Sequence, residues 1–373
     1  MPKHIPLLIS LLLLGGLAVA APQFAQAQDF QIEDNNNSNT DERQPANDRL
    51  KELLEEGREL VDAGNFSRAI GIYQQAANLD GKNARVFSAI GYLQARQGNY
   101  QKAAEAYRQA IELDSKNDDF HYALGYTLAN LNDNAGAAAE YRRAIQLNRN
   151  NANAYMGLGV VLLRQRDPQG ALSAYEEAIK LDPKSVEIRK SIATILLEQK
   201  RYQDAINVLE RAIALDPKDS SLQISVASAY LGQGNQREAI AALERAAKLE
   251  PRNAQIQLEI GNLWQSQNNL SAALAAYQQA VSLDNKLVEA HNGIGQIFLQ
   301  QRDFSQAVSV YRRLAEIAPD QGYVHYNLGV ALSNRGEVEA AIAAFKQARK
   351  VFQRQNVKEG MERADAALRQ LQR

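Results

Sequence analysis

Residues 152–185 read ANAYMGLGVVLLRQRDPQGALSAYEEAIKLDPKS and show the pattern from which the fold can be predicted. Two segments rich in Ala, Leu and Val, each long enough for a helix, are separated by a short polar turn. Each segment carries a small residue, Gly159 in the first and Ala171 in the second. Asp182-Pro183 then stops the second segment, because proline cannot continue a helix. The stretch therefore predicts a hairpin of two helices.

The same pattern returns every 34 residues from Leu50 onward, without insertion. A fixed period of this length is typical of helical repeat proteins. The nine predicted repeats are 50–83, 84–117, 118–151, 152–185, 186–219, 220–253, 254–287, 288–321 and 322–355. Each can bury its apolar face only against its neighbours, so the repeats predict one elongated array.

Two positions of the repeat are always small. The eighth position is Gly57, Gly91, Gly125, Gly159, Ala193, Ala227, Gly261, Gly295 and Gly329. The twentieth position is Ala69, Ala103, Ala137, Ala171, Ala205, Ala239, Ala273, Ala307 and Ala341. Small residues at fixed positions on two helices indicate that the backbones approach closely, where a larger side chain would overpack the contact by ~1–3 kcal/mol.

The remaining positions carry a family resemblance. Position 24 is aromatic or leucine, position 27 is alanine in eight repeats, and position 30 is Leu, Ile or Val. These residues resemble the tetratricopeptide repeat (TPR) family, whose pattern of a large residue, Leu-Gly, Ala, an aromatic, Ala and Pro is matched across residues 50–355. Local departures are Glu56 at position 7 of the first repeat and Gln353 where the last proline would lie.

The resemblance implies an all-α fold, a right-handed superhelical solenoid of nine TPR helix hairpins. It also implies that the first helix of each hairpin lines an inner groove. Residues 356–373 contain an amphipathic segment with Val357, Met361, Ala364 and Leu368 on one face. We therefore expect a C-terminal capping helix that separates the last hairpin from solvent.

Residues 1–27 have the features of a signal peptide. A basic start precedes an apolar run, and Ala25 and Ala27 form an A-x-A cleavage site, with cleavage after Ala20 as the alternative. An uncleaved anchor is a third interpretation, although the run is shorter than the ~20 residues of a spanning helix. We expect an exported mature chain without a membrane-inserted segment, in the periplasm or, alternatively, secreted or in the thylakoid lumen.

Residues 28–49 differ from the repeats in composition. They are rich in Asn and acidic residues, and their only large apolar side chains are Phe30 and Ile32. Such a segment cannot bury enough surface to order itself. We expect a disordered polar linker, with a docking tail as the alternative.

Composition argues against several classes of partner and chemistry. The chain has no cysteine, which excludes thiol catalysis, thiolate metal sites and disulfides. Its 42 basic and 43 acidic residues leave a net charge of -1, so there is little long-range attraction for nucleic acid.

No enzyme and no required cofactor is expected. His121, His291 and His325 all occupy the fourth position of a repeat, where the family places a large, mostly buried residue, so we interpret them as packed structural residues. No catalytic Ser-His-Asp set, glycine-rich phosphate loop or His-Glu helix motif is present in the sequence.

The predicted groove changes composition along the array. Repeats two and three offer a basic and aromatic set: Arg85, Tyr92, Arg96, Asp119, Tyr122, Tyr126 and Asn130. Repeats seven to nine offer a set rich in amides: Asn262, Gln265, Asn292, Gln296, Tyr326 and Asn327. Carboxamides can hydrogen-bond a peptide backbone and tyrosines give apolar area with a polar tip, which favours a protein or extended peptide as ligand. The alternative is that an inner wall facing water is merely polar.

A second hypothesis is a metal site. Glu259 and Glu289 are predicted to be neighbours on adjacent first helices, flanked by Asn262 and Asn292, and their oxygens suit a hard cation such as Mn²⁺. The signal peptide and the nine repeats are also similar to exported cyanobacterial TPR proteins. That similarity implies manganese binding and delivery for photosystem II assembly as the alternative function.

The preferred interpretation is an exported TPR scaffold. We expect it to bind a partner protein or extended peptide in its concave groove and to assist assembly or maturation of a periplasmic or membrane complex. The carboxylate clamp of chaperone-binding TPR domains is absent, because Lys190 is followed by Thr194 and Ser225 in place of the asparagine and the basic residue that the clamp needs.

Overall fold

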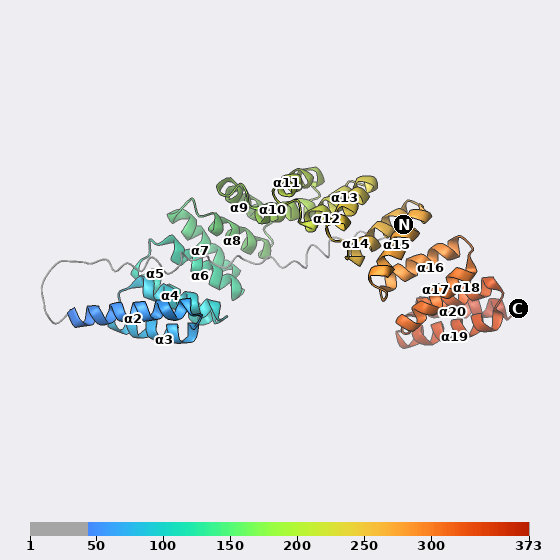
Figure 1. The fold of residues 1–373 in the computed structure, drawn as a ribbon, viewed down its shortest axis with the longest axis horizontal. Coiled ribbons are helices and arrows are strands. Elements are labelled where there is room, and N and C mark those ends of the chain that lie inside the picture. The colour runs from blue at the N-terminus through green and yellow to red at the C-terminus, as the bar shows by residue number, and fades with distance from the viewer. Residues whose placement is uncertain (1–43, 373) are drawn as a thin grey trace. The chain divides into compact units, whose positions relative to one another are not determined.

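The computed structural model describes residues 44–372 (Figure 1). The predicted signal peptide 1–27 lies outside the described residues, and so do residues 28–43 of the predicted linker. The described part of the chain forms nineteen helices and no strand, which confirms the all-α prediction.

The described helices divide into two compact bodies, with the boundary between Leu215 and Asp216. The N-terminal body contains α2 (Gln44–Asp62), α3 (Phe66–Leu79), α4 (Ala84–Arg96), α5 (Tyr100–Leu113), α6 (Asp118–Asn130), α7 (Asn134–Leu147), α8 (Ala152–Arg164), α9 (Pro168–Leu181), α10 (Val186–Glu198) and α11 (Tyr202–Leu215). The C-terminal body contains α12 (Ser220–Gly232), α13 (Gln236–Leu249), α14 (Ala254–Ser266), α15 (Leu270–Leu283), α16 (Val288–Gln300), α17 (Phe304–Ile317), α18 (Gly322–Arg335), α19 (Val338–Arg354) and α20 (Lys358–Leu371).

Within each body, consecutive helices pair as hairpins, as Figure 1 shows. The N-terminal body has five hairpins, from α2–α3 to α10–α11, and the C-terminal body has four, from α12–α13 to α18–α19. In α8 and α9 the first helix covers positions 1–13 of the repeat and the second covers positions 17–30. The predicted hairpins and their 34-residue period are confirmed.

Each hairpin is closed by a matched pair of residues at positions 8 and 24. A Cβ atom added to Gly159 would lie 2.7 Å from the Tyr175 ring, and one added to Gly125 would lie 3.0 Å from Tyr141. All seven repeats with glycine at position 8 have an aromatic ring at position 24. The two repeats with alanine there have leucine instead, in the pairs Ala193–Leu209 and Ala227–Leu243. The smaller residue at position 8 is paired with the larger residue at position 24. The two volumes compensate each other because protein interiors pack at near-crystalline density.

The turn between the two helices has one backbone geometry throughout. Position 15 has a positive φ in all nine hairpins, as in Gly98 at 76° and Lys200 at 59°. Only four of the nine are glycine; the others are Asn132, Arg166, Lys200, Asn268 and Arg302. A left-handed residue after the first helix lets the chain reverse in three residues and satisfies the last carbonyls of the helix.

The three histidines are packed structural residues, as predicted. They are 6%, 8% and 9% exposed in chain order. Each places Nε2 at hydrogen-bond distance from the carbonyl oxygen six residues earlier, at position 32 of the preceding repeat. The pairs are His121 with Ser115 at 3.2 Å, His291 with Asn285 at 3.1 Å, and His325 with Pro319 at 2.8 Å. Since a carbonyl can only accept, Nε2 donates, and the imidazole joins one repeat to the next.

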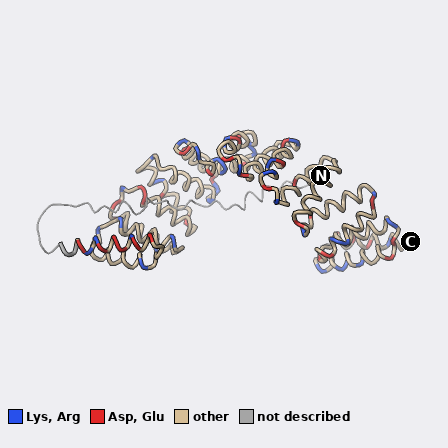
Figure 2. The backbone as a smooth tube through the Cα atoms, viewed as in Figure 1, with Lys and Arg blue, Asp and Glu red and all other residues tan. Residues whose placement is uncertain are grey.

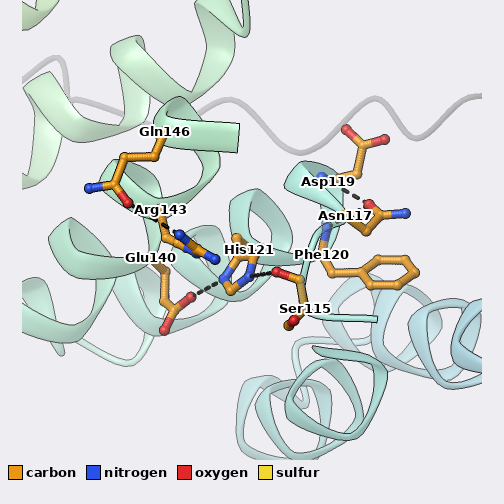
Figure 3. A network of polar contacts seen from close by, with 8 residues as sticks. All are labelled: Ser115, Asn117, Asp119, Phe120, His121, Glu140, Arg143 and Gln146. Carbon is orange, nitrogen blue, oxygen red and sulfur yellow. Dashed lines mark hydrogen bonds and ion pairs between the residues drawn. The ribbon is translucent and has the colours of Figure 1, made fainter. Parts of the chain in front are cut away.

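His121 makes a second side-chain contact. Among the hydrogen bonds of residues 44–372, His291 and His325 have no counterpart of it. Its Nδ1 lies 2.6 Å from Oε2 of Glu140 on α7, as Figure 3 shows. The carboxylate of Glu140 and the carbonyl of Ser115 thus lie at the two ring nitrogens of His121. The ring therefore links α6 to α7 as well as to the preceding turn.

Side-chain hydrogen bonds also connect the start of a first helix to the turn after the second helix. In repeat three, Asp118 accepts from Nδ2 of Asn148 at 2.9 Å and from Nδ2 of Asn151 at 3.1 Å. In repeat six the roles are exchanged, since the hydroxyl of Ser220 donates to the carboxylate of Glu250. In both repeats a hydrogen bond joins positions 1 and 31. In these two hairpins it connects the start of the first helix to the end of the second.

The ends of the array differ from the repeats inside it. The first helix begins at Gln44, six residues before the predicted start of the repeats, so the predicted linker end at residue 49 is wrong. Proline at the second residue of α2 is compatible with the first turn of a helix, and Leu50 and Leu53 on the same helix are buried.

The predicted capping helix is confirmed as α20. It buries Ala364 completely and covers the end of α19, where Val351 and Phe352 are each 1% exposed. A Cβ added to Gly360 would lie 2.5 Å from the Phe352 ring, so the helix approaches that ring closely. The last hairpin is therefore not open to solvent on its outer apolar side.

Candidate protein-binding surface

The candidate surface of the N-terminal body is built from residues of α4 and α6. Arg96 ends α4 and is exposed, with its guanidinium carbon 5.3 Å from the ring centre of Phe66 and 5.9 Å from that of Tyr92. A guanidinium stacked on aromatic faces loses little freedom and keeps its N–H donors in a fixed plane. The cluster places a cation beside two aromatic rings, and Tyr92 and Arg96 lie together in it.

Phe66 is the member of this cluster that the sequence analysis missed. It is the first residue of α3, at position 17, outside the first helix to which the predicted groove was confined. The signal in the sequence was an aromatic residue at position 17, which recurs as Tyr100, Tyr202 and Phe304. Its burial is intermediate, so the ring is available at the edge of the hairpin.

Tyr126 and Asn130 lie one turn apart on α6, on its partly exposed side. Nδ2 of Asn130 donates to the backbone oxygen of Tyr126 at 2.9 Å. Burial, followed by the nearby Tyr100, raises the pKa of Tyr126. Asn130 is exposed and Tyr126 half-buried, so both can contact a ligand.

Tyr122 is not a surface residue, which corrects its predicted role as a platform for a ligand. It is 6% exposed, and its ring centre lies 5.9 Å from that of Tyr141 at an angle of 45°. Burial raises its pKa to about 12. Position 5 of the repeat therefore faces the core in α6, where Tyr122 lies against Tyr141 of α7. A change of Tyr122 to alanine would open a cavity in the fold.

Asp119 and Arg85 lie in the first turns of their helices and are exposed. Burial, followed by the neighbouring Asp118, raises the pKa of Asp119. The carboxylate stands beside His121 in the chain but outside the imidazole contacts (Figure 3). Both residues lie at position 2, at the opposite end of the first helices from Arg96 and Asn130.

In the C-terminal body, several predicted amides lie at hydrogen-bond distance from tyrosine hydroxyls, although Asn262 is exposed and Gln265 and Asn292 are half-buried. The hydroxyl of Tyr277 lies 2.8 Å from Oδ1 of Asn262 and 2.8 Å from Oε1 of Gln265. Both amide oxygens are acceptors, and the hydroxyl has one proton to donate, so it donates to one of the two oxygens at a time. The hydroxyl of Tyr311 lies 3.5 Å from Asn292. These amides therefore lie at hydrogen-bond distance from the tyrosines at position 24.

The other predicted residues of this body are placed on α16 and α18. Gln296 is exposed, and Asn327 is half-buried and hydrogen-bonds to Tyr311, which lowers the pKa of that tyrosine against the larger raising effect of burial. Tyr326 packs on Phe345 with ring centres 5.4 Å apart. The exposed aromatic of α18 is Tyr323, which is 46% exposed and stands edge-on to Phe352.

The metal hypothesis gains no ligand set from the described residues. Glu259 is 8% exposed and lies 3.4 Å from the amide nitrogens of both Gln255 and Asn262, whereas Glu289 is exposed in the first turn of α16. Among residues 44–372, no group of three or more His, Cys, Asp or Glu side chains is placed to hold a metal ion.

Basic and acidic residues are mixed along the chain in both bodies. Lys, Arg, Asp and Glu are interspersed along both bodies, as Figure 2 shows. Among the helices of residues 44–372, none combines the length and apolar character that crossing a membrane requires.

Comparison with known proteins agrees with the fold. Residues 44–292 match the family model described as the C-terminal domain of cilia and flagella-associated protein 70, which is a TPR model, and residues 292–357 match a tetratricopeptide repeat model. A TPR repeat-containing protein of Picosynechococcus sp. is 45% identical over 47 residues, which are 13% of this chain and 12% of that protein. The chain thus matches about an eighth of the length of this relative.

Two solved structures illustrate the structural likeness. The C-terminal part of a TPR repeat-containing protein from Cytophaga hutchinsonii has a TM-score of 0.59 at 14% identity, over 64% of this chain and 98% of that one. YrrB, described as a TPR protein with an unusual peptide-binding site, has a TM-score of 0.45 at 20% identity, over 49% of this chain and 95% of that one. With the two family models covering residues 44–357, the chain belongs to the tetratricopeptide repeat family.

Proposed function

We propose that the chain is an exported scaffold that binds a partner protein through the first-helix side of its hairpins. Its role would be to assist assembly or maturation of a periplasmic or membrane complex. The fold supports a binding role over catalysis, because TPR hairpins present a rigid surface on which a few residues decide the partner.

The observation that carries the proposal is the cluster of Arg96, Tyr92 and Phe66. Tyr and Arg are enriched among the residues that dominate protein interfaces, since they combine large contact area with hydrogen-bond donors. Here the arginine is already held against two rings. A partner would lose little free energy in ordering it. Tyr126 and Asn130 extend the same side onto α6.

The proposal is tested by capture of the partner with the full chain from an extract of its own source. The test variant combines Tyr92→Ala and Arg96→Ala. The matched control combines Lys102→Ala and Arg108→Ala, two exposed side chains on the second helix α5. We expect the control to capture the partner like the wild type and the test variant to lose at least tenfold in affinity.

A different result would move the interaction elsewhere. Equal capture by both variants, with helical content unchanged by circular dichroism, contradicts binding on the first-helix side. Loss of capture only in the α5 variant assigns the partner to the outer helices.

A further inference from the structure

The cluster around Arg96 contains an exposed cation whose partners are aromatic. Its guanidinium carbon lies within 6 Å of two ring centres, and no Asp or Glu of residues 44–372 forms an ion pair with it. The arginines of the described chain that do form ion pairs include seven with a carboxylate within 3.4 Å. Arg96 is held in place by stacking, with its N–H edge left for an acceptor.

The positive charge is a local property of α4. This helix contains Arg85 and Arg96 and no acidic residue. The residues at the same repeat position as Arg96 are Asp62 on α2 and Asn130 on α6, so the neighbouring first helices do not repeat the cation. A ligand that carries a carboxylate next to apolar side chains would match α4 better than either neighbour.

The chain itself contains such a segment just before α2. Residues 29–34 read DFQIED and place the carboxylates of Asp29, Glu33 and Asp34 around the apolar Phe30 and Ile32. We propose that residues 29–34 bind in cis to the Arg96 cluster, with a carboxylate on the guanidinium and Phe30 or Ile32 against Tyr92 and Phe66. The inference rests on the proposed function, because the same cluster would receive the partner.

The segment is long enough to reach the site. Helix α2 has 19 residues and is therefore ~28 Å long at 1.5 Å per residue. Since α2 and α4 are both first helices and run parallel, Arg96 lies near the far end of α2 from Gln44. Asp34 precedes Gln44 by ten residues, which span up to ~33 Å when extended. The segment can run back along the first helices and place its acidic residues at Arg96.

Binding in cis has a functional consequence. A tether of this length gives an effective concentration on the order of millimolar, so even weak contacts keep the site occupied. A partner would then have to displace the segment, and its apparent affinity would fall by the fraction of free site. Residues 29–34 would act as an internal competitor that raises the selectivity of the scaffold.

The absence of cysteine from the sequence allows a direct test on the full chain. Gln31→Cys and Ser67→Cys place two thiols, one in the segment and one beside Phe66 on the exposed side of α3. The rate of intramolecular cross-linking by a short bis-maleimide, read by mass spectrometry, reports how often the segment lies at the cluster. We expect this rate to fall at least fivefold with Arg96→Gln and again in 0.5 M NaCl, since charge attraction is screened.

The matched control is Arg68→Gln, which removes an exposed guanidinium from α3 next to the reporter thiol. It should leave the rate within twofold of the parent. Equal rates in the Arg96→Gln and Arg68→Gln variants overturn the proposal, as does a cross-link that forms between two chains, which would assign the site to a second copy.

A second measurement separates this inference from the proposed function. A synthetic peptide of residues 28–43 is titrated onto the full chain and onto the triple variant Asp29→Asn, Glu33→Gln and Asp34→Asn. Tighter binding by at least fivefold to the triple variant is expected, because its own segment no longer competes. Equal binding, or none to either chain, contradicts cis binding but leaves capture of the partner by the Arg96 cluster untouched.

Discussion

At the residue scale, the strongest constraint is the exchange of volume between positions 8 and 24. Gly159→Ala should cost ~1–3 kcal/mol of unfolding free energy, because the new methyl group meets the Tyr175 ring 2.7 Å away. Adding Tyr175→Leu, which recreates the native pair Ala193–Leu209, should recover much of that loss. Denaturant melts of both single variants and the double variant give the coupling free energy, and additive effects would contradict the pairing.

The turns give a second prediction for single residues, in which a substitution increases the stability of the chain. Lys200 has φ of 59°, in the left-handed region that costs a residue with a Cβ about 1–2 kcal/mol. Lys200→Gly should therefore stabilise the chain by roughly 0.5–1 kcal/mol, after the greater chain entropy of glycine is subtracted. Gly98→Ala, at the same position of another repeat, is the control and should destabilise. Equal melting of Lys200→Gly and the parent would show that the strain is relieved elsewhere.

At the element scale, the hairpin α12–α13 is joined by hydrogen bonds to a titratable group, the carboxylate of Glu250. Hydrogen bonds from Ser220 and then Asn253 lower the pKa of Glu250. Because the pKa of Glu250 is lower in the folded chain than in the unfolded chain, its ionised carboxylate stabilises the fold at pH values above the unfolded pKa. This stabilisation is lost as pH falls through the folded pKa. Glu250→Gln should thus lower the melting temperature more at pH 6 than at pH 3, and only slightly, because Glu250 is largely exposed. The same deficit at both pH values would contradict an ionic role.

The capping helix gives another prediction for an element. Deletion of residues 358–373 would expose Val351 and Phe352, which are each 1% exposed under α20. We expect a lower melting temperature and concentration-dependent self-association, measured by analytical ultracentrifugation, because exposed apolar area at the end of a repeat array is sticky. The control shortens the chain by its last residue only. A monomer of unchanged stability would show that α20 is not a cap.

At the scale of the whole molecule, export remains a prediction from the sequence. Edman sequencing or intact mass of the protein from its native host should give Gln28 as the first residue if cleavage follows Ala27. A first residue at Ala21 would support the alternative site after Ala20. Retention of residues 1–27 would mean that the scaffold stays anchored, and the cis segment 29–34 would then lie between the anchor and the array.

The hairpin architecture of the repeats follows from the amino-acid pattern alone. The 34-residue period, the small residues at positions 8 and 20, and the prolines after the second helices fixed the hairpins, because helix packing is a local property repeated nine times. The histidines at position 4 were also interpreted correctly, since one position of a periodic fold has one environment.

The contacts of the polar side chains, in contrast, depend on how the helices pack. Tyr122, Asn262 and Gln265 fit a ligand surface by position, yet Tyr122 packs on Tyr141, and both amides lie at hydrogen-bond distance from the Tyr277 hydroxyl. Phe66, in contrast, joins Arg96 from a different helix. Burial and partner choice depend on a second helix, which belongs to the same hairpin for Tyr122, Asn262 and Gln265 and to the next hairpin for Phe66, whereas helix periodicity reports only the face of a single helix.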